Sequence, residues 1–220
     1  MQALRFEQTG NLDFLQLVEL PTPTLKNNEV LIEVKAARLN RNDISNVMGR
    51  LPYTTIPRTP GRDYAGIIVA GPSALIGKEV WGTGKENGFV QDGSHSTYMK
   101  VHQDAISLKP KSLSFIEAAN CGTPYITAWG AVQGCQIKEG MRVVIIGANG
   151  AVGNAAVEIA RMQKAQVLGL VRNQAYIAGI LEQGVQAAIL PTDPNTLKQL
   201  IRNYFPDGAD VIFDTTGYWI

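Results

Sequence analysis

The sequence is poor in the features that define several classes of protein. Two cysteines in 220 residues exclude a disulfide scaffold, and the apolar surroundings of Cys121 and Cys135 predict buried thiols. No apolar run approaches the roughly 20 residues that cross a bilayer. The N-terminus lacks the basic start and apolar core of a secretory signal. The formal net charge of +1 gives no electrostatic argument for binding nucleic acid or a membrane.

What is present is the composition of a soluble globular protein, with 45% hydrophobic and 18% charged residues. At this length the chain can hold one large domain or two small ones. Because no targeting or membrane segment is visible, we expect a cytoplasmic protein that acts on a small molecule.

The most informative stretch is a glycine-rich turn between two apolar runs. Residues 143–146 are apolar, the turn follows at 147–153 (Gly-Ala-Asn-Gly-Ala-Val-Gly), and a segment of helical period leads to a second apolar run at 167–171. Strand, glycine turn, helix and strand in this order are typical of a dinucleotide-binding unit. Glycine permits a tight turn and the close approach of a pyrophosphate, and the N–H groups and dipole of a helix start bind phosphate.

The same unit predicts which residues contact the cofactor and which cofactor binds. The predicted contacts in the turn are Gly147, Asn149, Gly150, Ala151, Val152 and Gly153. About 20 positions past the turn, a residue of this fold meets the adenosine ribose, and an acid there would favour NAD. The sequence instead has Arg172 and Asn173, and arginine suits a 2′-phosphate, so we predict NADPH. Two alternatives stay open: Arg172 is a solvated arginine without cofactor preference, or the turn holds no ligand.

The order of the expected elements divides the chain into two domains. Short strands with glycine and proline turns over residues 1–110 favour a barrel-like β domain. Strands and helices alternate from residue 141, which predicts a doubly wound parallel sheet. The expected strands are 15–20, 30–39, 65–70, 79–81, 96–101, 142–146, 166–171, 187–190 and 209–214. The expected helices are 40–48, 112–120, 124–132, 151–163, 174–183 and 194–204.

The predicted fold class is therefore α/β, with a β-rich domain over residues 1–122 and a Rossmann domain over residues 123–220. The Rossmann pattern has six strands, and four are predicted before residue 220. We thus expect this domain to be incomplete at its C-terminus, through an incomplete listing, a fragment or a natural truncation.

Several further segments resemble one known family. They are Leu39–Asp43, Pro60–Gly66, Thr127, Gly208–Asp210 and Asp214–Gly217. Together with the glycine turn they are similar to the zinc-independent, quinone oxidoreductase-like members of the medium-chain dehydrogenase/reductase superfamily. The resemblance covers the whole chain and implies a GroES-like first domain of the alcohol dehydrogenase type. It also implies hydride transfer from a nicotinamide to a quinone or an activated alkene. Relatives often dimerise through later strands of the sheet, so a homo-oligomer stays open.

The resemblance also bears on metal. Zinc-containing members use a cysteine near position 39–40 and a His-Glu pair where this chain has Arg62-Asp63, and this sequence has neither. His95 and His102 have no metal-ligand spacing to a cysteine, so we interpret them as ordinary polar residues and predict no metal. Without a Lewis acid, the favoured acceptors are those that delocalise incoming charge, namely quinones and α,β-unsaturated carbonyls.

The residues that face the substrate are implied by the same resemblance. Asn40 and Asp43 match the turn that faces the substrate and the nicotinamide, although capping of a helical turn is the favoured role for Asp43. Tyr53 stands where relatives have an aromatic pocket residue, and it could donate a proton or hydrogen bond to an oxyanion. Packing of Tyr53 at a domain interface is the alternative. Thr127 matches a residue that approaches the nicotinamide end of the cofactor. The weaker candidates are Arg62 and Tyr64.

Three functions fit this reading of the sequence. The first is an NADPH-dependent, zinc-independent oxidoreductase that reduces a quinone or an activated carbonyl. The second is an enoyl-thioester reductase, which would share this architecture and use Tyr53 as proton donor. The third is a non-catalytic relative that binds NADPH in a structural role.

Overall fold

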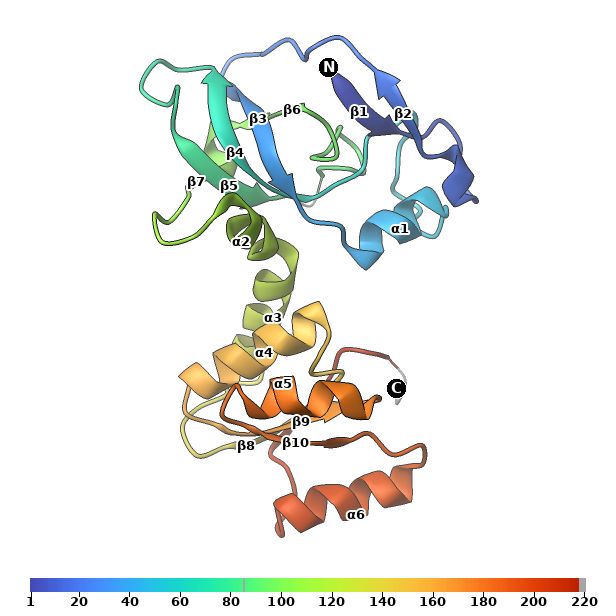
Figure 1. The fold of residues 1–220 in the computed structure, drawn as a ribbon, viewed down its shortest axis with the longest axis vertical. Helices are drawn as coiled ribbons and strands as arrows, with labels where there is room; N and C mark the ends of the chain where they lie inside the picture. Colours follow the sequence, from blue (N-terminus) through green and yellow to red (C-terminus); the bar gives the residue numbers. More distant parts are fainter. Residues whose placement is uncertain (85, 218–220) are drawn as a thin grey trace. The chain divides into compact units, whose positions relative to one another are not determined.

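The computed structural model describes residues 1–84 and 86–217. The chain divides into two compact units, Met1–Thr123 and Pro124–Ile220. The first is rich in strands and the second alternates strands and helices around a parallel sheet, which confirms the predicted α/β class (Figure 1). Across the described residues, no helix combines the length and apolar character that crossing a bilayer requires.

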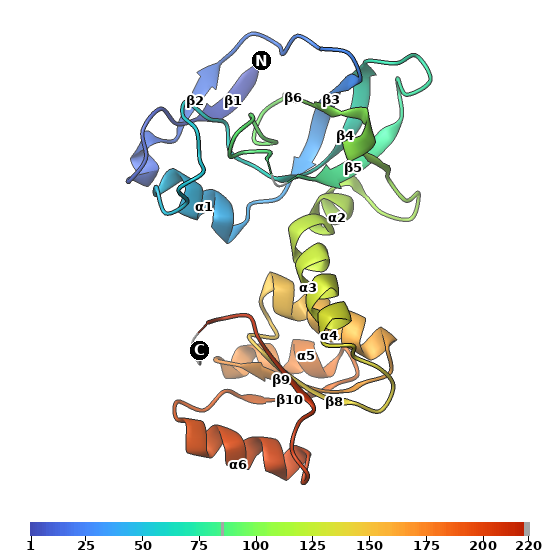
Figure 2. The ribbon, with the colours of Figure 1, turned by 180° about the vertical axis from the view of Figure 1, so that it is seen from behind.

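The first unit is built on a five-stranded antiparallel sheet in the order β6-β3-β4-β5-β7. Its strands are β3 (Glu29–Ala37), β4 (Asp63–Ala70), β5 (Glu79–Thr83), β6 (Tyr98–His102) and β7 (Ser107–Leu108). A separate ribbon pairs β1 (Gln2–Arg5) with β2 (Gln16–Glu19) in antiparallel register (Figure 2). An isolated bridge between Ala3 and Ser96 holds this ribbon beside the segment that leads into β6.

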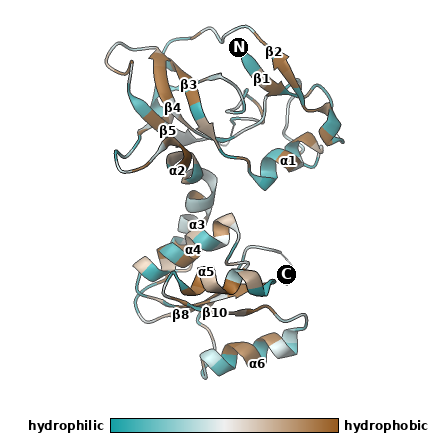
Figure 3. Ribbon diagram, viewed as in Figure 1, coloured by the Kyte–Doolittle hydropathy of each residue, from teal (hydrophilic) through white to brown (hydrophobic). Residues whose placement is uncertain are grey.

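Alternation along β3 explains how this sheet buries one face. Val30 and Ile32 are fully buried in an apolar cluster with residues of β4, β5 and β6. Glu33 and Lys35 point away from this cluster and form an ion pair at 2.6 Å. The apolar bands that result on β3 and β4 are visible in Figure 3.

Short helices complete the first unit. They are α1 (Arg41–Val47), α2 (Phe115–Asn120) and the 3-10 turns Leu12–Phe14 and Gln103–Ala105. Ser114 begins α2 with a capping box: its hydroxyl accepts the Glu117 N–H at 3.2 Å, and the Glu117 carboxylate accepts the Ser114 N–H at 2.8 Å. Helix α3 (Gly122–Gly134) follows directly.

The second unit is a four-stranded parallel sheet in the order β10-β9-β8-β11, the strand order of a Rossmann half. Its strands are β8 (Arg142–Ile146), β9 (Gln166–Val171), β10 (Gln186–Ile189) and β11 (Val211–Asp214). Its helices after α3 are α4 (Ala151–Met162), α5 (Ile177–Leu181) and α6 (Pro194–Tyr204).

Two apolar layers sandwich this sheet. Val143 and Ile145 face a cluster that includes residues of α3, α4 and α5, whereas Val144 and Ile146 face a cluster completed by α6. Both views of the ribbon show α4 and α5 on one face and α6 on the other (Figures 1 and 2). An apolar run such as 143–146 is therefore buried on both sides, as parallel strands usually are.

Some local predictions are wrong. The helix predicted over 174–183 is a 3-10 turn at Gln174–Tyr176 followed by the short α5, because the Asn173 side chain caps the turn. Strands β1 and β7 are not among the predicted strands, and β7, with 2 residues, is too short to show a period. Cys121 is half-buried and Cys135 is exposed just after α3, so the expectation of two buried thiols fails.

Candidate active site

The glycine turn leads from β8 into α4. Gly147 has a φ of +78°, in the left-handed region that favours glycine. The N–H groups of Gly147 and Ala148 both donate to the carbonyl oxygen of Leu170, at 2.9 and 3.1 Å. These bonds fasten the turn to the end of β9 and direct the chain into the helix.

Close packing inside the turn requires glycine at its last position. A Cβ on Gly153 would lie 2.1 Å from the carbonyl oxygen of Gly147. Within the described residues, the N–H groups of Ala151, Val152 and Gly153 have no backbone acceptor, as at any helix start. Together with the positive end of the helix dipole, these donors can hold phosphate oxygens.

The side chains of the turn take different positions. Asn149 and Ala151 are exposed, and Gly150 is the N-cap residue of α4. Val152 packs its side chain against the apolar cluster beneath the helix, so only its backbone can face a ligand. The turn therefore fits a pyrophosphate held mainly by backbone groups.

The residues predicted to meet the ribose directly follow β9. Arg172 is exposed, and the Asn173 side-chain oxygen accepts the Ala175 N–H at 2.9 Å. Since β8 and β9 are parallel neighbours, Arg172 lies at the same edge of the sheet as the glycine turn. Thr127 lies on an exposed face of α3, on a different element.

Sequence reasoning missed the segment after β11 as part of this site. The Thr215 hydroxyl donates to the Ile146 carbonyl at 2.9 Å, and an Asp214 carboxylate oxygen accepts the Thr216 N–H at 2.7 Å. A Cβ on Gly147 would lie 2.5 Å from the Thr215 hydroxyl oxygen. The signal was Asp-Thr-Thr directly after an apolar strand, because such side chains bond to nearby backbone.

A second group of candidate residues surrounds the start of α1 in the first unit. Asn40 is the N-cap residue, and its N–H donates to the Asp43 carboxylate at 2.7 Å. The Asn40 amide nitrogen donates to Asp63 at 2.9 Å, and its oxygen accepts from the Arg38 Nε at 3.2 Å. The structure thus brings Asn40 and Asp43 together and gives Asp43 the capping role.

Asp63 is the centre of this polar cluster, and the sequence did not single it out. Its side chain is fully buried, and it accepts hydrogen bonds from the Thr123 N–H at 3.1 Å and the Thr123 hydroxyl at 2.8 Å in addition to Asn40. A buried carboxylate is tolerated only when such donors surround it. The available signal was an acid at the first position of an otherwise apolar strand, β4.

The Asp43 carboxyl group has an unusual environment. It is 2% exposed, and one of its oxygens has no hydrogen-bond partner among the described residues. Burial raises the pKa of Asp43, the Asn40 N–H and the nearby His95 oppose the rise, and the neighbouring Asp63 adds to it. Asp43 therefore takes up a proton more readily than an exposed aspartate would.

Tyr53 belongs to an aromatic cluster on the loop after α1. The residue is 53% exposed, and the centroid of its ring lies 5.5 Å from that of the buried Phe89. The guanidinium carbon of Arg62 lies over the same ring, 5.3 Å from its centroid. The buried Asn46 accepts a hydrogen bond from the Thr54 hydroxyl, which holds the loop against α1. Tyr53 is thus held by a ring contact with Phe89 while the residue stays exposed.

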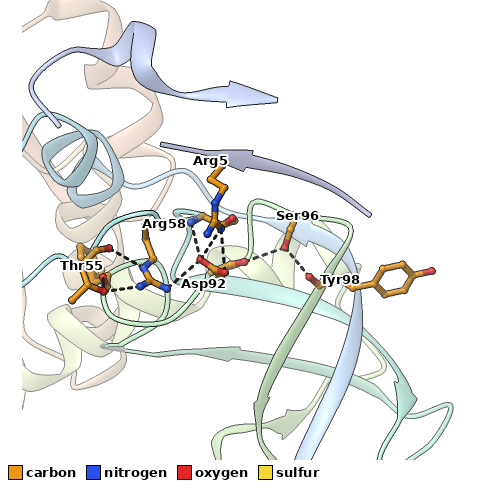
Figure 4. A network of polar contacts seen from close by, with 9 residues as sticks. Arg5, Thr55, Arg58, Asp92, Ser96 and Tyr98 are labelled. Atoms are coloured by element: carbon orange, nitrogen blue, oxygen red, sulfur yellow. Dashed lines mark hydrogen bonds and ion pairs between the residues drawn. The ribbon is translucent and has the colours of Figure 1, made fainter. Parts of the chain in front are cut away.

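An ion-pair network holds the far end of this loop. Asp92 pairs with Arg58 at 3.1 Å and with Arg5 of β1 at 3.3 Å (Figure 4). Arg58 also donates to the carbonyl and hydroxyl oxygens of Thr55, at 3.0 and 2.6 Å. Since α1 holds one end of the loop and this network holds the other, the loop that carries Tyr53 is fixed at both ends.

The remaining candidates have structural roles. The Tyr64 ring is fully buried and its hydroxyl donates to the Ala105 carbonyl at 3.2 Å, so Tyr64 belongs to the core. The His95 Nε2 lies 3.1 Å from the Arg38 carbonyl oxygen, and the His102 Nδ1 accepts the Asp104 N–H at 3.3 Å. Over the described residues, no group of three His, Cys, Asp or Glu side chains is arranged to hold a metal ion.

Comparisons with known proteins follow the same division of the chain. The family model described as "Alcohol dehydrogenase GroES-like domain" matches residues 26–111, which span β3 to β7. A zinc-type alcohol dehydrogenase-like protein of Schizosaccharomyces pombe is 36% identical over 92% of this chain and 59% of its own length. The quinone oxidoreductase of Sus scrofa is 30% identical over 97% of this chain and 66% of its own length.

A solved structure shows the same fold. The crystal structure of an NAD-dependent alcohol dehydrogenase superposes with a TM-score of 0.90 at 26% identity, over 99% of this chain and 71% of that one. The chain spans 59% and 66% of the lengths of the two relatives named above. From the parallel sheet with its glycine turn, the matching first unit and these relatives, we conclude that the chain belongs to the medium-chain dehydrogenase/reductase superfamily and is quinone oxidoreductase-like.

Proposed function

We propose that this chain binds NADPH and serves the reduction of a quinone or an α,β-unsaturated carbonyl compound without zinc. The observation that carries the proposal is the turn from Gly147 to Gly153. The turn packs too closely to admit a Cβ at Gly147 or Gly153, and it presents the N–H groups of a helix start. The exposed Arg172 at the same edge of the sheet supports NADPH over NADH, because a guanidinium pairs well with a 2′-phosphate.

Each group of residues has a distinct task in this proposal. When bound, the cofactor supplies a hydride. The N–H groups of Ala151 to Gly153 hold its phosphates, and Arg172 holds the 2′-phosphate. A conjugated acceptor carries the incoming charge as a phenolate or enolate, which hydrogen-bond donors can stabilise without a Lewis acid. The exposed Tyr53 carries a hydroxyl that is suited to donate that hydrogen bond or a proton.

The cofactor assignment is tested by Arg172→Ala. This variant should bind NADPH roughly 10- to 100-fold more weakly, since a charge-assisted hydrogen bond is worth about 1.5–3 kcal/mol. The dissociation constant for NADH should change little. Arg202→Ala is the matched control, because it removes an equally exposed arginine from α6. Fluorescence titration of each protein with both nucleotides gives the dissociation constants, and equal losses for NADPH and NADH in Arg172→Ala would rule out the 2′-phosphate role.

The zinc-free chemistry has its own test. Metal analysis of the purified protein should find no stoichiometric zinc, and one zinc per chain would overturn this part of the proposal. Binding of NADPH without its oxidation by any quinone or enone would instead favour a non-catalytic role.

The exposure of Tyr53 also favours a second function, the reduction of an enoyl thioester with Tyr53 as proton donor. Turnover of an enoyl thioester but not of a quinone would select this function. Tyr53→Phe should then slow product protonation while leaving NADPH affinity unchanged. A Tyr53→Phe variant with full enoyl-thioester turnover would argue against it.

A further inference from the structure

Arg62 differs from the other half-buried arginines of the first unit. It immediately precedes β4, its Nε donates to the Gly84 carbonyl at 3.2 Å, and its guanidinium lies over the ring of Phe89. These two contacts use one edge and one face of the guanidinium group. In the described part of the chain, no carboxylate lies within 4.0 Å of Arg62, and its two terminal nitrogens make no hydrogen bond.

The other arginines show what an internal structural role looks like. Arg5 and Arg58 are both paired with Asp92, and Arg38 donates to the side chains of Asn40 and Asn120. A guanidinium stays charged at any physiological pH and offers its terminal nitrogens as a planar fork. A half-buried guanidinium whose two terminal nitrogens remain available suits a carboxylate, which pairs with it through two parallel hydrogen bonds.

The surroundings of Arg62 indicate what kind of molecule carries that carboxylate. The Phe89 ring beneath the guanidinium also contacts the ring of the exposed Tyr53. The Arg62 cation and the Tyr53 hydroxyl donor therefore belong to side chains that pack on the same aromatic ring. The next residue, Asp63, binds the side chain of Asn40 at the candidate turn. Arg62 therefore belongs to the candidate residues of the first unit, and the exposed Tyr53 beside it suits a flat, conjugated molecule.

We propose that Arg62 binds a carboxylate group of the reducible acceptor, and that the chain selects α,β-unsaturated carbonyl compounds that carry a carboxylate over neutral ones. This inference rests on the proposed reductase function for its turnover test. Its binding test needs no turnover. Arg62 acts as a specificity residue here, because it recognises a group next to the bond that is reduced.

The turnover test compares β-acetylacrylate with its methyl ester, which have the same reducible bond and differ in charge. With NADPH, the ratio of kcat/KM for the acid to that for the ester should fall roughly 10- to 100-fold in Arg62→Gln. Taking this ratio cancels the different intrinsic reactivities of the two compounds. Arg62→Lys, which keeps the charge but not the fork, should give an intermediate ratio. Arg50→Gln removes an exposed arginine from the same region and should leave the ratio unchanged.

The binding test uses levulinate and methyl levulinate, saturated analogues that cannot be reduced. By calorimetry, the wild-type chain should bind levulinate at least about tenfold more tightly than the ester, and Arg62→Gln should abolish this preference. Equal affinities in the wild type would overturn the proposal, whether or not Arg62→Gln folds. A loss of NADPH affinity in Arg62→Gln as large as the loss of levulinate affinity would also overturn it, since Arg62 would then serve the cofactor. Failure of both acceptors and of quinones to oxidise NADPH would refute the reductase function, and the levulinate titration would still decide the role of Arg62.

Discussion

The two units of this chain are stabilised by different kinds of interaction. Within the described residues, every buried polar or charged side chain lies in the first unit: Asp43, Asn46, Thr59, Asp63, Asn87 and Ser94. The fully buried side chains described in the second unit are apolar and form two layers, one on either side of its sheet. The glycine turn of its candidate site consequently presents mainly backbone groups, whereas the candidate site of the first unit is made of side chains.

This difference separates what each unit can tolerate. A polar cluster around one acid is destabilised when that acid is removed, because its part-buried donors lose their common acceptor. A turn that binds through its backbone groups and packs on an apolar layer tolerates most changes of side chain. It fails only when an added group fills the space inside the turn. Four substitutions test this contrast.

The largest effect is expected from Asp63→Ala. It leaves the Thr123 N–H, the Thr123 hydroxyl and the Asn40 amide without their common acceptor. An unpaired buried donor costs about 1–3 kcal/mol, and these three part-buried donors lie near the lower end of that range, so the free energy of unfolding of the first unit should fall by about 3–5 kcal/mol. Hydrogen exchange followed by mass spectrometry reads both units in one experiment, and peptides from β8 to β11 should stay protected.

Two controls accompany this prediction. Asp63→Asn keeps one acceptor oxygen and should lose less stability than Asp63→Ala. Asp104→Ala removes an exposed acid of the same unit and should stay within about 0.5 kcal/mol of the wild type. If Asp104→Ala were as harmful as Asp63→Ala, the polar cluster would not be what holds the first unit together.

The next effect belongs to the second unit, with Gly153→Ala. The added methyl would start 2.1 Å from the Gly147 carbonyl oxygen, so the turn must shift. Overpacking of this kind costs about 1–3 kcal/mol of stability. Displacement of the helix-start N–H groups should also weaken NADPH binding, which titration would show. Unchanged NADPH affinity in a folded Gly153→Ala protein would contradict the assignment of this turn to the cofactor.

The same contrast explains how much the sequence could predict. Strands β8 and β9 and helix α6 begin and end where their periods predict, since burial on one or both faces leaves a pattern along the chain. The glycine turn can likewise be predicted from one short, continuous stretch of sequence. Asp193 before Pro194 likewise marks the start of α6, where the Asp193 carboxylate accepts the Thr196 N–H at 2.9 Å.

The polar cluster of the first unit could not be predicted in this way. Asp63 and Thr123 are 60 positions apart and Asn40 and Asp63 are 23 apart, and no period links them. Arg62 and Phe89 meet only because two loops fold together. Tyr53 and Asn40 became candidates through resemblance to a family, which identifies positions and not their partners.

A smaller effect of opposite sign is expected from Gly179→Ala. Gly179 is an exposed residue of α5, and a Cβ there would meet nothing within 4 Å. Alanine in a helix is favoured over glycine by about 0.5–1 kcal/mol, so the second unit should become more stable by about that amount. Urea denaturation of Gly179→Ala and of Gly153→Ala compares the same change at two glycines of the second unit. Destabilisation by both would mean that general intolerance of the unit, rather than the closed turn, explains Gly153.

The smallest effect is expected from Asp43→Asn, and its sign depends on pH. Burial raises the pKa of Asp43 in the folded chain above 3.8, so the folded state binds this proton more tightly than the unfolded state. Stability gained from that proton is fully present below pH 3.8 and is lost as pH rises through the folded pKa. Asparagine cannot ionise and can still accept the Asn40 N–H through its amide oxygen, so it avoids this loss.

Asp43→Asn should therefore be slightly more stable than the wild type at neutral pH, with the advantage shrinking as the pH falls toward 3.8. The net gain is small because asparagine also gives up the attraction between the Asp43 carboxylate and His95. Urea midpoints for both proteins across this pH range provide the measurement. An advantage that did not vary with pH would mean that packing or capping, and not the buried charge of Asp43, distinguishes the two chains. A pH-dependent advantage would instead show that the first unit retains a carboxylate at a cost in stability, as expected of a residue kept for its site rather than for its fold.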